Sequence, residues 1–64
     1  MEIKIKDYNN TDSCMIVKTE EGFINFQQHE EDRGTYRQTE IILDKKQLSE
    51  FIGVLLHLQS KMRK

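Results

Sequence analysis

The chain of 64 residues has no proline and only one cysteine, Cys14. A single cysteine excludes an intrachain disulfide, so a reducing compartment is the expected setting. No apolar run approaches the ~20 residues of a membrane-spanning helix, and the first residues lack the apolar core of a signal peptide. We therefore expect a soluble, cytoplasmic protein.

An excess of charge of either sign is also missing. Ten basic and eleven acidic residues give a formal net charge of −1. Such a balance provides no bulk attraction to nucleic acid or to an anionic membrane, so any binding of that kind must come from a local patch. The three glycines, Gly22, Gly34 and Gly53, are isolated, which excludes a glycine-rich phosphate-binding loop.

The chain is also too short to bury a large apolar core. A domain of about 60 residues buries only about 60% of the surface that its unfolded chain exposes, and it usually needs disulfides, a metal or a partner to be stable. Since no disulfide is possible here, we expect one domain, residues 1–64, that forms a homodimer.

Residues that could carry catalysis or bind a metal do not form a recognisable site. Cys14 lies beside Met15 in an apolar segment without a glycine-rich turn, as expected of a buried structural thiol rather than a nucleophile. His29 and the acidic run 30–32 read as a solvated turn, because calcium loops alternate their oxygen ligands around a glycine. One cysteine and two widely separated histidines do not make a zinc site. We expect no enzyme activity, no cofactor and no metal.

Four segments have the pattern of β-strands. Apolar and polar residues alternate, or β-branched residues are frequent, in residues 2–8, 14–19, 23–29 and 35–43. Asparagine, aspartate and glycine fill the intervals between them, as is typical of turns. In the third segment Ile24 and Phe26 fall on one face, and Asn25 and Gln27 fall on the other.

The last third of the chain predicts one helix over residues 45–62. Asp44 and Gln47 have the spacing of a capping box, and Leu43 with Leu48 has that of a hydrophobic staple. The fold class is therefore α+β, a four-stranded antiparallel β-meander followed by one C-terminal helix (ββββα). We expect the helix to pack on one face of the sheet and to leave the other face to solvent.

The helix carries more apolar surface than one sheet face can cover. We expect part of it to form the dimer interface, with candidate residues Phe51, Val54, Leu55, Leu58 and Met62. Gly53 lies among them, where glycine costs about 1 kcal/mol relative to alanine. It either permits close approach of another helix or is simply tolerated.

The polar face of the sheet is the candidate nucleic-acid-binding surface. Cations contact phosphates, amides reach base edges and aromatic rings stack on bases. The candidate contacts are Lys4, Lys6, Tyr8, Lys18, Asn25, Gln27 and Arg37. Alternatively, these are ordinary solvent-facing residues. Tyr36 and Arg37 point to opposite faces of a regular strand, so only a bulge would place both on one surface.

The order of the predicted elements is similar to that of a known family. The stretches 24–27, 34–37 and 41–43, followed by Gln47, Leu48 and Phe51, resemble the purine-rich-element-binding (PUR) repeat, and more distantly the fold of positive cofactor four. The resemblance covers about residues 14–58. It implies binding of single-stranded DNA or RNA on the concave sheet and pairing of two subunits largely through their helices. By position, the contacts would be Lys4, Lys6, Lys18, Asn25, Gln27 and Arg37.

Two functions follow as hypotheses. The first is a small homodimeric single-stranded nucleic-acid-binding protein of bacterial or phage type, with little sequence preference. The second is a protein-interaction module of phage or mobile-element type, such as an inhibitor or an adaptor, without nucleic-acid binding. The alternating lysines favour the first, and the near-neutral charge and small size favour the second.

Overall fold

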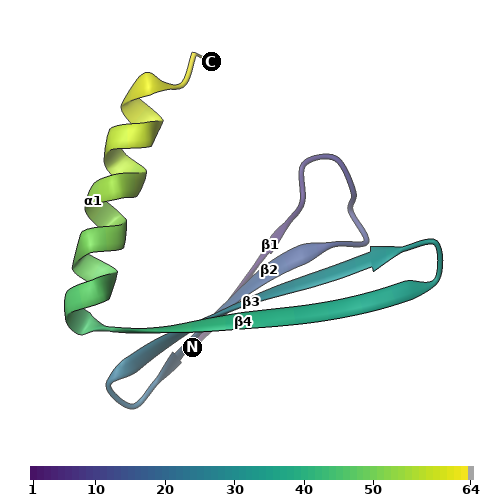
Figure 1. The fold of residues 1–64 in the computed structure, drawn as a ribbon, viewed down its shortest axis with the longest axis horizontal. Coiled ribbons are helices and arrows are strands. Elements are labelled where there is room, and N and C mark those ends of the chain that lie inside the picture. Colours follow the sequence, from purple (N-terminus) through teal and green to yellow (C-terminus); the bar gives the residue numbers. More distant parts are fainter. Residues whose placement is uncertain (64) are drawn as a thin grey trace.

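The computed structural model describes residues 1–63 and consists of four strands followed by one helix (Figure 1). The elements are β1 (Glu2–Lys6), β2 (Cys14–Glu20), β3 (Phe23–Asp32), β4 (Thr35–Asp44) and α1 (Lys45–Lys61). The strands form one antiparallel sheet in the order β1-β2-β3-β4, so each strand pairs with its neighbour in sequence. The predicted ββββα fold of the α+β class is confirmed.

Two strand ends differ by more than one residue from the sequence expectation. β1 ends at Lys6 rather than at Tyr8, because the carboxylate of Asp7 accepts hydrogen bonds from the backbone N–H groups of Asn9 (2.9 Å) and Asn10 (2.8 Å) and so turns the chain. β3 continues through the acidic run to Asp32, which pairs with the first residue of β4. The acidic run 30–32 therefore belongs to a strand, and the expectation that it forms a turn is wrong.

The strand register separates the two faces of the sheet. In one row across all four strands, Ile3 lies opposite Val17, and Phe26 lies between Val17 and Ile41. This apolar face comprises Ile3, Ile5, Met15, Val17, Ile24, Phe26, Ile41 and Leu43. The opposite face, called the polar face below, carries Lys4, Lys6, Lys18, Asn25 and Gln27.

The expectation that α1 packs across one sheet face is wrong. Figure 1 shows the helix leaving the end of β4 and rising away from the sheet. Asp44 is both the last residue of β4 and the N-cap of α1, so no loop turns the helix back onto the strands. The rings of Phe51 and Phe26 do meet, edge to face, with centroids 5.4 Å apart and an interplanar angle of 86°. Only the start of the helix therefore rests on the sheet.

A single chain does not close a core. Among residues 1–63 no apolar side chain is buried, and the two buried residues are the amides Asn25 and Gln27. The radius of gyration is 13.5 Å, whereas a compact domain of this length has about 11 Å. The shape is that of an open angle, with the sheet on one side and the helix on the other (Figure 1).

The turn between β3 and β4 depends on backbone conformations that favour glycine. Arg33 has φ +52° and Gly34 has φ +82°, and positive φ at both central residues is typical of a type I′ hairpin turn. Glycine adopts this conformation without the steric cost that a Cβ atom adds. Gly34 is therefore needed for its backbone freedom, whereas Gly53, in α1, is not.

Replacing Gly34 by alanine should lower the free energy of unfolding by about 1 kcal/mol, because a side chain at φ +82° is strained. Gly53→Ala is the matched control. Its Cβ would meet no atom within 4 Å, and alanine in a helix interior should raise the free energy of unfolding by about 1 kcal/mol. Urea unfolding at one fixed protein concentration measures both changes, and equal changes of the same sign would contradict this account.

Candidate functional site

Three lysines form a group on the polar face, and we call them the lysine strip: Lys4 and Lys6 of β1 and Lys18 of β2. Lys4 and Lys6 are exposed on an edge strand. Within residues 1–63 the one ion pair joins Lys18 Nζ to Glu2 Oε1 at 3.5 Å, with 39% and 58% of the two side chains exposed. A pair this exposed is worth at most about 1 kcal/mol, so it does not prevent Lys18 from meeting an anion.

The two predicted amide contacts lie on the same face but are not accessible. Asn25 is 5% exposed and Gln27 is 8% exposed, because both lie on the inner strand β3 between side chains of β2 and β4. The Asn25 amide donates to Glu40 Oε2 at 3.0 Å and to Glu20 Oε1 at 3.3 Å. These amides organise the polar face, and they present almost no surface to a ligand laid on it.

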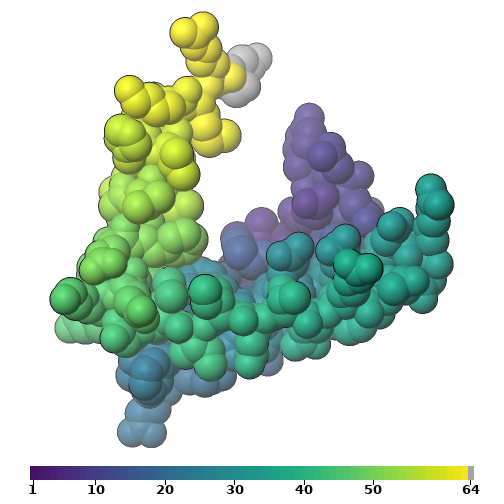
Figure 2. Space-filling view, viewed as in Figure 1, coloured from purple at the N-terminus to yellow at the C-terminus, as the bar shows by residue number. Residues whose placement is uncertain are grey.

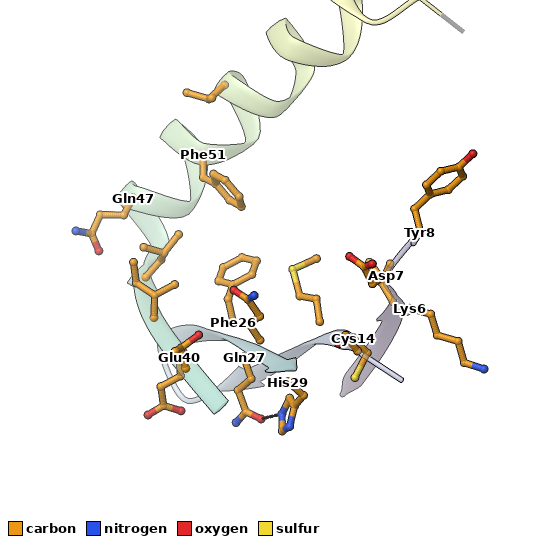
Figure 3. A pocket seen from close by; sticks show the side chains of 18 of the residues that line it. Lys6, Asp7, Tyr8, Cys14, Phe26, Gln27, His29, Glu40, Gln47 and Phe51 are labelled. Atoms are coloured by element: carbon orange, nitrogen blue, oxygen red, sulfur yellow. Dashed lines mark hydrogen bonds between the residues drawn. The ribbon is translucent and has the colours of Figure 1, made fainter. Parts of the chain in front are cut away.

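The remaining two predicted contacts lie elsewhere. Arg37 is opposite Glu30 in the register and projects from the apolar side of the sheet. Tyr8 is 97% exposed in the loop between β1 and β2, and Figure 3 shows its ring on the side of the sheet where α1 lies. Of the seven predicted nucleic-acid contacts, the structure brings together the three lysines on an accessible surface.

One polar network of this face was not predicted from the sequence. His29 Nε2 donates to Gln27 Oε1 at 2.9 Å (Figure 3), and Nδ1 is hydrogen-bonded to the Tyr36 hydroxyl. That hydroxyl also contacts Gln38 Oε1 at 3.4 Å. The sequence signal was the alternation of Gln27 with His29 and of Tyr36 with Gln38, which places all four residues on one face. The network holds the ring of Tyr36 on the polar face, at the β4 side.

The second candidate surface is a groove on the apolar side of the sheet. It lies between α1, the apolar face and the β1–β2 loop, it is open to solvent in Figure 2, and its volume is about 920 Å³. Its apolar lining is Ile5, Met15, Phe26, Ile41, Leu43, Phe51 and Val54, with Tyr8 at the rim. Figure 3 shows Phe26 pointing up toward Phe51, whereas Glu40, Gln27 and His29 point to the other side of the sheet.

Two of the five predicted interface residues of the helix, Phe51 and Val54, line this groove. Leu55, Leu58 and Met62 expose 47%, 53% and 73% of their surface. No residue of α1 is buried. The helix thus presents its apolar residues to solvent in a single chain.

Neither surface has the donor set of a metal centre. Within residues 1–63 no group of three or more histidine, cysteine, aspartate or glutamate residues is placed to hold a metal ion. Cys14 is a free thiol on β2, half-buried and opposite His29 in the register. In the same part of the chain no helix is long and apolar enough to cross a membrane. The lysine strip can bind anions, and the groove can bind apolar surface.

The chain matches no known protein family, no curated protein and no solved structure. The resemblance to the PUR repeat stays a prediction.

The position of Asn25 leads to a prediction about stability. Its Oδ1 atom is buried without a hydrogen-bond partner, which costs about 1–3 kcal/mol. Asn25→Val removes this acceptor and raises the strand propensity, while the two glutamates turn to water. We expect the free energy of unfolding to stay equal or to rise by about 1 kcal/mol in urea titrations. A loss of 2 kcal/mol or more would contradict this assignment of the amide.

Proposed function

We propose that this chain is a non-enzymatic, homodimeric protein that binds single-stranded nucleic acid on the polar face of its sheet. The observation that supports the proposal is the lysine strip, because three cationic side chains project from one open face. α1 and the apolar groove lie on the opposite side, so pairing through that side leaves the lysines accessible. DNA and RNA are equally compatible with this surface.

The strip has a geometry that a phosphate backbone can follow. Lys4 and Lys6 lie two residues apart on one strand, which corresponds to about 6.6 Å. The half-buried Ile16 lies opposite Lys4 and adds apolar surface beside the cations. Tyr36, which is 59% exposed, offers a ring on which a base can stack. The combination of cations with an exposed aromatic ring favours binding through backbone and stacking, with little sequence readout.

A labelled oligonucleotide of about 20 nucleotides tests the proposal by fluorescence anisotropy at low salt. We expect binding that weakens as salt rises, with log affinity falling by about 2 per tenfold increase for three neutralised phosphates per chain. Lys4→Glu combined with Lys6→Glu should abolish the binding, since it reverses the charge of two members of the strip.

The control is Lys45→Glu combined with Lys46→Glu. It makes the same change in net charge in the first turn of α1, where acidic residues suit the helix dipole. This control should bind the oligonucleotide as the parent does. Absence of binding by the parent at micromolar concentration, or equal loss in both double variants, would overturn the proposal.

A second candidate function is a protein-interaction module without nucleic-acid binding. The observation that favours it is the open apolar groove, a kind of surface that protein partners cover. The carboxylates of Glu20 and Glu40, which accept from the Asn25 amide, also add negative charge to the polar face and so reduce its positive field. Salt distinguishes the two functions, because an apolar interface does not follow the counterion dependence of phosphate binding.

A further inference from the structure

We infer that the groove of one chain takes α1 of a second copy of this chain, and that the second copy's groove takes α1 of the first. The inference rests on the homodimer in the proposed function and deepens it, because it names the two surfaces that meet. Three observations support it: the large exposed area of one chain, the apolar residues on two sides of α1, and the match between groove and helix in a pair of chains related by two-fold symmetry.

The exposed area is too large for a monomer. The chain exposes 5930 Å², whereas a compact monomer of 7.7 kDa exposes about 4,300 Å². The excess is roughly 1,600 Å² per chain. Two copies that each bury this excess share an interface of roughly 3,200 Å², which is within the range of about 2,000–5,000 Å² for obligate homodimers.

The helix is apolar on two sides. Phe51 and Val54 point into the chain's own groove. At 100° per residue, Leu55, Ile52 and Leu56 follow Phe51 around the helix axis at about 40°, 100° and 140°, on the side away from Val54, and we call these three residues the outer stripe. These three residues expose 47%, 48% and 61% of their surface. A helix that packs against one neighbour needs one stripe of apolar residues. The outer stripe therefore needs a second apolar surface to pack against.

The same chain carries both surfaces that need a cover. Within residues 1–63 no apolar element fills the groove, and no apolar surface packs against the outer stripe of α1. A two-fold pair satisfies both needs with one contact that is made twice, and a net charge of −1 adds little repulsion between copies. Pairing of two β4 edge strands would instead leave the groove and the stripe exposed, so it does not account for the excess area.

Site-directed cross-linking of mixed variants tests the inference. All variants carry Cys14→Ser, so that each chain has a single cysteine. One chain carries Leu55→Cys on the outer stripe, and the other carries Gln28→Cys, which lies on the apolar side of the sheet and lines the groove. After the two are unfolded, mixed and refolded, a short bismaleimide should join them into a two-chain product.

The matched control replaces Gln28→Cys by Lys4→Cys, on the opposite face of the same sheet. We expect no product between Lys4→Cys and Leu55→Cys. Gln38→Cys alone reports on β4 edge pairing and should give no product either. If Gln28→Cys prevents folding, as judged by circular dichroism, Thr39→Cys takes its place, since it is the cross-strand neighbour of Gln28 in the groove.

Three results would overturn the inference. They are a sedimentation mass of one chain at micromolar concentration, a two-chain mass without the product between positions 28 and 55, and a product from Gln38→Cys alone. The parent should also melt at a temperature that rises with protein concentration, as expected of a fold that is completed by association. The variants at positions 28, 39 and 55 leave the lysine strip intact, so oligonucleotide binding by these chains without the cross-link would overturn the inference and spare the proposed function.

Discussion

The pair of hydrogen bonds between Asp44 and Gln47 fixes where the strands end and the helix begins. The Asp44 carboxylate accepts from the Gln47 backbone N–H at 2.8 Å, and the Gln47 side chain accepts from the Asp44 N–H at 3.1 Å. Because the N-cap is itself the end of β4, the helix axis is set by the direction of that strand. The groove exists because this junction has no loop, and the rest of the architecture depends on it.

In this chain polar side chains are buried and apolar side chains are exposed, which is the reverse of the usual pattern. The two buried residues among residues 1–63 are amides on the polar face, while the apolar face remains open. Long side chains of neighbouring strands cover the amides. On the apolar face, Met15 and Ile41 are 39% and 61% exposed, and Phe26 is only partly covered, with the Phe51 ring against it. A protein normally buries its apolar groups first, so this open apolar face is the surface that the proposed dimer would cover.

The element order and the capping box could be predicted from the sequence because they depend on local patterns. Alternation with period two and the Asp44 to Gln47 spacing act within a few residues. The direction of α1 could not be predicted, since it depends on whether β4 stays paired with β3 up to the residue that caps the helix. The candidate site was foreseen in part: alternation placed Lys4, Lys6 and Lys18 on one face. It gave no measure of the burial of Asn25, which is decided by the neighbouring strands.

The simple strand order has a consequence for how the chain folds. Every strand pairs with its immediate neighbour along the chain, so the sheet forms by closing short loops, which is fast in folding proteins of low contact order. In the proposed dimer, the remaining apolar surface is covered by an encounter between two chains, whose rate rises with their concentration. The time that such a chain spends exposed to chaperones and proteases would then be set by its abundance rather than by its own folding rate.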